Sequence, residues 1–313
     1  MSRQGVAFDT AARDRARDRA SLPTASGPVG WLPLILLPAG VLISGRQLAP
    51  WALMWALSIA IYAALKWLTW WRGRTLVNQV ELGRSLGYLF LWPGLDAPTF
   101  LDARRTAAPV TNRELVSALL ALSVGLVLLF GAVRTVPARM PLLAGWVGLF
   151  GLIFVLHFGA FRLLSIWWRW HGVAAAPLMQ APITAVSLGD FWGARWNTAF
   201  HVLARDYVVR PLRRRLGVPA AMFVAFLASG LIHDLVISVP AGAGYGLPTA
   251  YFGLQGLGLL LERAPAGRKL GLARERRGRL FTIAVAALPA FWLFHPAFVI
   301  NVVLPFLKVV GAR

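Results

Sequence analysis

Long apolar segments alternate with short polar segments along most of this chain. The apolar segments of membrane-spanning or near-spanning length are residues 31–44, 51–71, 115–133, 142–168, 218–239, 247–261 and 280–310. A helical span needs about 20 mostly apolar residues, and its backbone must satisfy its own polar groups in lipid. The strand alternation of a membrane barrel is absent. The pattern therefore predicts an all-α membrane protein, a bundle of about seven to nine transmembrane helices.

The pattern also predicts the domain organisation. Residues 1–28 are polar, with charges of alternating sign, and we expect a disordered cytoplasmic tail. Residues 29–313 are expected to form a single transmembrane domain, with its main polar motifs in 187–262. Segment 31–44 is short enough for a signal peptide, but no convincing cleavage site follows it, so a first span is preferred.

Composition and charge support a membrane location. The 313 residues are 58% hydrophobic and 14% charged, against about 25% charged in a typical globular protein. The net charge of +20 could indicate nucleic-acid binding, which requires a soluble basic face. Here the Arg residues lie in the segments between spans, as the positive-inside rule places them. The sequence therefore predicts a bilayer partner and no nucleic acid.

The distribution of basic residues also predicts orientation. Placing the N-terminal tail and segments 72–114, 169–217 and 262–279 on the cytoplasmic side collects nearly all of the Arg and Lys there. The excess of Arg over Lys and the abundance of Ala and Gly are typical of a high-GC bacterium. The prediction is a multi-pass protein of a bacterial inner membrane with a cytoplasmic N-terminus.

An ionisable residue inside a span is costly and is a candidate functional residue. His233 lies inside 218–239, next to Asp234 and one helical turn after Ser229, which shares its helix face. The pKa of histidine suits general-base catalysis near neutrality. A structural histidine capped by a neighbouring helix is the alternative.

A second polar motif ends 36 residues upstream of His233. The run SLGDFWGARWN (187–197) combines aromatic, charged and glycine residues, so it is neither a span nor an ordinary solvated loop. Its candidate functional residues are Asp190, Trp192, Arg195, Trp196 and Asn197. Taken alone, the run predicts an interfacial amphipathic helix with its Trp residues at the level of the lipid head groups.

Several motifs in order resemble the wax-synthase branch of the membrane-bound O-acyltransferases. They are FLWPGLDAPTF (90–100), SLGDFWGARWN, RDYVVRPL (205–212), FLASGLIHDL (226–235) and FWLFHPAF (291–298). The resemblance implies that His233 is the catalytic base and that Asn197 assists it. The family commonly has Glu after the His, where this chain has Asp234, a departure that keeps the carboxylate.

The resemblance implies transfer of a fatty acyl group from acyl-CoA to a hydroxyl acceptor, most simply a long-chain alcohol, giving a wax ester. The active site would be an embedded tunnel. His233 can accept the hydroxyl proton, and Asn197 can donate to the developing oxyanion. The absence of Cys fits a reaction without an acyl-enzyme. No cofactor beyond the co-substrate acyl-CoA is expected, and no cluster has metal-ligand spacing.

Further residues are candidates for substrate contact. The basic residues Arg210, Arg213, Arg214 and Arg215 could bind the phosphates of coenzyme A, or could serve topology alone. Gln255 is a candidate pocket-lining group, whereas His157 and His295 are more simply packed residues. The G-x-S-x-G match at 83–87 lacks the α/β sheet that the motif requires.

Two alternatives to the wax-synthase interpretation stay open. One is an O-acetyltransferase for a small metabolite or polysaccharide, and the other is a non-catalytic transporter or assembly subunit.

Overall fold

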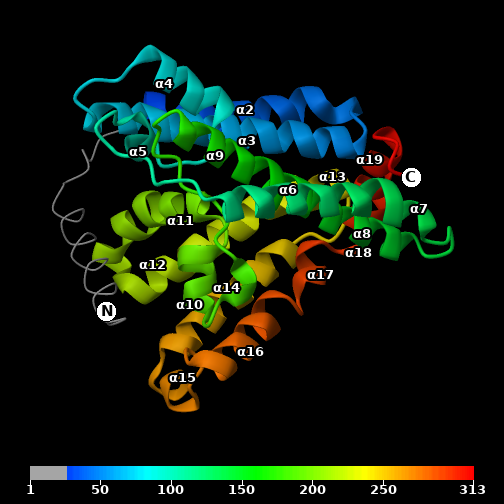
Figure 1. The fold of residues 1–313 in the computed structure, drawn as a ribbon. Coiled ribbons are helices and arrows are strands. Elements are labelled where there is room, and N and C mark those ends of the chain that lie inside the picture. Colours follow the sequence, from blue (N-terminus) through cyan, green and yellow to red (C-terminus); the bar gives the residue numbers. More distant parts are fainter. Residues whose placement is uncertain (1–26) are drawn as a thin grey trace.

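The computed structural model describes residues 27–313, and every regular element in that range is a helix (Figure 1). The predicted tail at 1–28 lies almost wholly outside the described residues. The N-terminal half contains α2 (Pro28–Ser44), α3 (Pro50–Gly73), α4 (Leu82–Leu86), α5 (Ala97–Leu101), α6 (Asn112–Val127), α7 (Val133–Thr135), α8 (Pro141–Ile153) and α9 (Phe161–Trp170). Prolines at the first positions of α2, α3 and α8 fit starts where the backbone N–H needs no helical partner.

The C-terminal half is more broken. It contains α10 (Leu188–Asp190), α11 (Thr198–Ala204), α12 (Arg210–His233), α13 (Val239–Ala241), α14 (Leu247–Arg263), α15 (Pro265–Leu270), α16 (Glu275–Ala286), α17 (Ala290–Leu293), α18 (Pro296–Phe298) and α19 (Leu304–Val309). Five-residue π-helical turns join α11 to α12 and α12 to α13. The second of these turns begins directly after His233.

Five helices are long and apolar enough to cross a membrane: residues 28–47, 50–76, 112–135, 141–170 and 198–241. A sixth is possible if the pair 275–293 and 296–309, bent by 55°, forms one broken span. The protein is therefore a multi-pass integral membrane protein. The prediction of seven to nine spans was too high within the described residues, partly because α14 has only 17 residues. A helix of that length reaches about 25 Å, less than the roughly 30 Å core of a bilayer.

The segment 198–241 also differs from the sequence prediction. A polar loop was expected up to residue 217, whereas the structure is helical from Thr198 onward. The predicted start of the span at 218 coincides with a real break, because Gly217 has φ +76° and Pro219 follows it. Glycine adopts this left-handed conformation without steric cost.

Two buried clusters hold the bundle together. One gathers Tyr88, Phe100 and Trp168 between α3, α5 and α9, with the Phe100 and Trp168 ring centroids 4.9 Å apart. The other packs α8 against the C-terminal helices. An ion pair of 2.5 Å between Glu114 and the buried Arg169 ties α6 to α9. Large apolar side chains on the outer surface, such as Ile35 and Val127, remain exposed, as expected for a surface that faces lipid.

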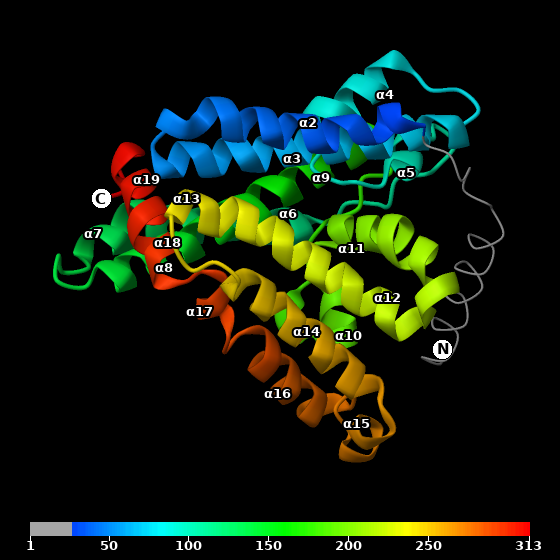
Figure 2. The same cartoon turned by 180° about the vertical axis from the view of Figure 1, so that it is seen from behind.

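The arrangement of the helices separates two ends of the molecule. Seen from both sides, α4 and α5 lie at the end opposite α7, α19 and the C-terminus (Figure 1, Figure 2). The α4–α5 end carries the basic segment 72–114, whereas the opposite end carries Arg134 in α7, Arg139 after it, and Lys308 and Arg313 near the C-terminus.

This separation allows a topology test on a chain that has no native Cys. Single Cys residues at the exposed positions Ala108 and Ala266 should be labelled from the cytoplasm by an impermeant maleimide, and one at Ala138 from the opposite side. Labelling of all three positions after membrane permeabilisation is the control. Labelling of Ala266→Cys from outside would reverse the predicted orientation.

Candidate active site

A cavity of about 1140 Å³ lies within the bundle, between α2 and α3 on one side and α11 and α12 on the other. Its walls are mostly aliphatic and aromatic, which is typical of a pocket for a lipid-like ligand. The polar side chains on its walls are Ser58, Tyr62, Lys66, His157, Asn197 and His233. The two residues predicted to carry the chemistry, 36 positions apart in sequence, therefore line the same cavity.

The ring of His233 is held in one orientation by its own helix. Its Nδ1 lies 2.7 Å from the carbonyl oxygen of Ser229, one turn earlier on α12. A carbonyl only accepts, so Nδ1 carries the proton and Nε2 keeps its lone pair. Phe252 of α14 packs against the ring, with centroids 4.4 Å apart. The ring is thus fixed in the tautomer that a general base requires, with Nε2 as the basic atom.

Asn197 occupies a strained backbone position directly before α11. Its φ is +46°, a left-handed conformation that Asn tolerates better than most residues. Its backbone N–H lies 3.2 Å from the sulfur of Met179, and its carbonyl accepts from the amides of Phe200 and His201. Within residues 27–313 the side-chain amide makes no hydrogen bond, so it remains available to a ligand in the cavity.

The residue before Asn197 is clamped between two rings. Trp196 stacks on His157 at 6.2 Å and on Phe191 at 5.6 Å, with interplanar angles of 16° and 14°. These contacts fix the direction in which the chain enters α11. Trp196 thus positions Asn197 and is not itself among the residues that line the cavity.

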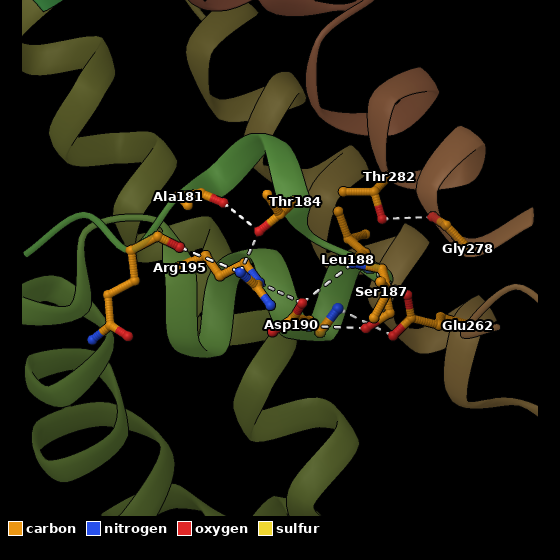
Figure 3. A network of polar contacts seen from close by, with 12 residues as sticks. Ala181, Thr184, Ser187, Leu188, Asp190, Arg195, Glu262, Gly278 and Thr282 are labelled. Atoms are coloured by element: carbon orange, nitrogen blue, oxygen red, sulfur yellow. Dashed lines mark hydrogen bonds and ion pairs between the residues drawn. The ribbon is translucent and has the colours of Figure 1, made fainter. Parts of the chain in front are cut away.

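The segment 187–195 is held by a polar network (Figure 3). Arg195 forms a 2.5 Å ion pair with Asp190. The hydroxyl of Ser187 accepts from the amide of Asp190 at 2.9 Å, which caps the short α10. The buried carboxylate of Glu262, from α14, accepts from the amides of Leu188 at 2.6 Å and Gly189 at 3.1 Å. Asp190 and Arg195, predicted to contact substrate, lie in this network and not on the cavity wall.

The carboxylate of Asp234 is bonded mainly to the start of α14. It accepts from the hydroxyls of Ser238 and Thr249 and from the amides of Gly246, at 2.8 Å, and Thr249, at 3.1 Å. These amides belong to the N-terminus of α14, where a negative charge is favourable. Asp234 therefore connects α12 to α14 and does not line the cavity that contains His233.

Trp192 and Gln255 form a second link to α14. The indole N–H of Trp192 donates to Oε1 of Gln255 at 3.2 Å, and Nε2 of Gln255 donates to the carbonyl of Val285 at 2.6 Å. Gln255 is fully buried and its amide is satisfied on both sides. This predicted pocket-lining residue instead joins the segment 187–197 to α14 and α16.

The predicted phosphate-binding Arg residues lie together at the break in α12. Arg210 is 3.7 Å from Asp206, and the next three basic residues, Arg213, Arg214 and Arg215, are exposed. They immediately precede Gly217, where the helix bends. The structure therefore presents them on the surface and not within the cavity.

Two cavity residues were missed or set aside in the sequence analysis. Lys66 lies inside the apolar segment 51–71, where a lone cation could have been recognised as costly and therefore as a candidate. It is only 1% exposed, and its Nζ lies 2.7 Å from the carbonyl oxygen of Gly94 and 3.1 Å from the ring centroid of Tyr88. His157, interpreted as a packed residue, also lines the cavity, and its Nδ1 is buried without a hydrogen-bond partner.

Tyr88, whose ring lies under the ammonium group of Lys66, is fully buried in the core and does not itself line the cavity. Its hydroxyl lies 2.7 Å from the hydroxyl of Thr69, and burial raises the pKa of Tyr88 well above its usual range. The phenol therefore stays neutral and presents its ring face to Lys66. Among residues 27–313, no group of three or more His, Asp or Glu side chains could hold a metal ion.

Comparison with known proteins gives a consistent family. Residues 175–252 match the model of the membrane bound O-acyl transferase family. A long-chain-alcohol O-fatty-acyltransferase of Simmondsia chinensis is 33% identical over 141 residues, which is 41% of this chain and 40% of that protein. Two probable long-chain-alcohol O-fatty-acyltransferases of Arabidopsis thaliana are 29% and 30% identical over 144 and 142 residues, 42% and 40% of each chain.

The match thus spans less than half of the length of these relatives. The stretch that matches the family model includes both Asn197 and His233, the two residues that the cavity brings together. Over residues 175–252 this chain is similar to the membrane bound O-acyl transferase family, and over about 40% of its length it is similar to long-chain-alcohol O-fatty-acyltransferases.

Proposed function

We propose that this protein is an acyl-CoA-dependent O-acyltransferase that esterifies a long-chain alcohol. The observation that carries the proposal is the cavity shared by Asn197 and His233, which combines a free amide, an oriented basic nitrogen and apolar walls. The relatives named for fatty-acyl transfer to long-chain alcohols support the same acceptor class.

The proposed reaction needs no covalent enzyme intermediate. Nε2 of His233 accepts the hydroxyl proton of the alcohol while the alcohol oxygen attacks the thioester carbonyl carbon. The side-chain amide of Asn197 donates to the oxyanion of the tetrahedral intermediate. Collapse of that intermediate breaks the carbon–sulfur bond, and the thiolate of coenzyme A receives the proton from His233. The products are a wax ester and free coenzyme A.

The size of the cavity favours a long chain over a short one. An acetyl group would fill little of its roughly 1140 Å³ and would leave the apolar walls unused. The non-catalytic alternative does not explain why the basic nitrogen of His233 and the amide of Asn197 lie unpaired on the same cavity. A membrane extract supplied with labelled palmitoyl-CoA and hexadecanol tests the proposal directly, and labelled acetyl-CoA tests the acetyltransferase alternative.

Replacing His233 tests the proposed base. His233→Ala should lower turnover by about 10²–10⁴-fold, the usual contribution of a general base, while the protein still inserts into the membrane. The matched control is His171→Ala, at an exposed histidine outside the cavity, which should leave turnover unchanged. Near-normal turnover of purified His233→Ala would refute the assignment.

Asn197 needs two substitutions because its backbone is strained. Asn197→Ala removes the amide and also places alanine at a φ of +46°. Asn197→Gly removes the amide but relieves the strain. If the amide stabilises the oxyanion, both variants should lose about 10²-fold in turnover with little change in KM. Recovery of turnover in the glycine variant alone would show that only the backbone conformation matters.

The exposed arginines are proposed to hold the phosphates of coenzyme A, remote from the reacting carbonyl. The double variant Arg214→Gln/Arg215→Gln should therefore raise the KM for acyl-CoA several-fold and leave turnover almost unchanged. In the parent this KM should rise with salt, because exposed ion pairs are screened over about 8–10 Å. The matched control is Arg276→Gln/Arg279→Gln on α16, also exposed. An unchanged KM in the first variant would assign these arginines to topology alone.

A further inference from the structure

A buried cation on an apolar cavity wall is the feature that the proposed reaction does not use. Lys66 is 1% exposed and lines the cavity from α3. No Asp or Glu among residues 27–313 lies within ion-pair distance of its ammonium group. A buried charge without a counter-ion is costly, so the position calls for a compensating negative group.

The contacts of Lys66 satisfy only part of its hydrogen-bonding capacity. An ammonium group carries three N–H donors. The carbonyl of Gly94 accepts one of them at 2.7 Å, and the ring face of Tyr88 lies 3.1 Å from Nζ. Both contacts hold the cation in place, and neither neutralises it.

Other polar atoms on the same cavity are also unpaired. Nε1 of Trp55 and Nδ1 of His157 are buried and have no hydrogen-bond partner. The buried part of a membrane bundle has no bulk water to satisfy such atoms. Unpaired donors around an apolar space fit a ligand that brings its own oxygen atoms together with a hydrocarbon chain.

We propose that the cavity is a binding site for a long-chain carboxylate, an unesterified fatty acid whose head group pairs with Lys66. The carboxylate supplies the missing counter-charge and accepts charge-assisted hydrogen bonds from the ammonium group. The alkyl chain lies against the apolar walls, and the volume of about 1140 Å³ accommodates a chain of 16 carbons. A fatty acid bound in this way occupies the cavity in place of the acyl chain of a substrate. The binding itself does not depend on the proposed reaction.

The test measures binding without turnover. Purified protein in phospholipid nanodiscs is photolabelled with a palmitate analogue that carries a diazirine in its chain, and the labelled peptides are identified by mass spectrometry. Label should appear on α3, α11 or α12. Unlabelled palmitate should compete at least about tenfold better than palmitamide, which has the same shape and no charge. Equal competition by the two compounds, or label found only on outward-facing surfaces, would overturn the proposal.

Variants at Lys66 locate the head group. Lys66→Met keeps the length of the side chain and removes the charge, so its affinity for palmitate should fall about tenfold or more while its affinity for palmitamide stays similar. Lys66→Arg keeps the charge and should retain most of the preference for palmitate. Lys269→Met, at an exposed lysine on α15, is the matched control and should behave as the parent.

The outcomes separate this proposal from the acyltransferase. Full palmitate preference in a folded Lys66→Met would refute the carboxylate site and leave the reaction at His233 untouched. If a membrane extract that contains the parent protein makes no wax ester, the proposed reaction is refuted, and the result on fatty-acid binding still stands. If Lys66→Met does not accumulate, the competition of palmitate against palmitamide on the parent and on Lys66→Arg still decides whether the site prefers a carboxylate.

Discussion

The structure depends on one constraint, that polar groups inside a membrane bundle must find partners within the protein. Lipid offers no hydrogen bonds, so each unpaired buried group costs free energy. Most of the bundle meets this requirement: Arg169 pairs with Glu114, Gln255 is bonded on both sides, and Thr69 meets Tyr88. Among the described residues, two of the buried atoms without a hydrogen-bond partner, Nε1 of Trp55 and Nδ1 of His157, lie on the cavity, where a ligand could satisfy them, whereas the others belong to Arg side chains outside it.

The position of His233, the proposed catalytic base, depends on how α12 packs against α14. The two helices approach closely at glycines: a side chain at Gly230 would come within 2.7 Å of Thr249, and one at Gly256 within 2.8 Å of Phe223. Small residues at such contacts let helix backbones approach in membranes. Asp234 then fixes the helix register by capping α14. Asp234, next to the proposed base, therefore serves the fold, and the ring of His233 is oriented by the backbone of its own helix.

The sequence was sufficient to identify the helical class and five of the spans, and it predicted a pairing of Asn197 with His233, which line one cavity and whose roles stay a prediction. The pairing came from a resemblance of motifs, because nothing in the spacing of 36 residues brings the two together. The roles of Asp190, Arg195 and Gln255 could not be predicted. A polar residue in a motif serves either to contact a ligand or to hold the motif in shape, and only the partners show which. Lys66 was missed for the same reason. The surroundings of its ammonium group are set by Tyr88 and Gly94, which lie more than 20 residues away in the sequence.

The walls of the cavity come from two separate parts of the chain. Asn197 and His233 lie in the stretch 175–252 that matches the family model, whereas Pro33, Tyr62 and Pro93 on the opposite wall precede it by more than 80 residues. In the proposed reaction the first part supplies the groups that act on the carbonyl, and the second supplies most of the surface against which a chain would lie. The two parts also pack against each other outside the cavity, as at Trp31 and Tyr207, whose ring centroids lie 6.0 Å apart, so a substitution on α2 or α3 can affect both parts.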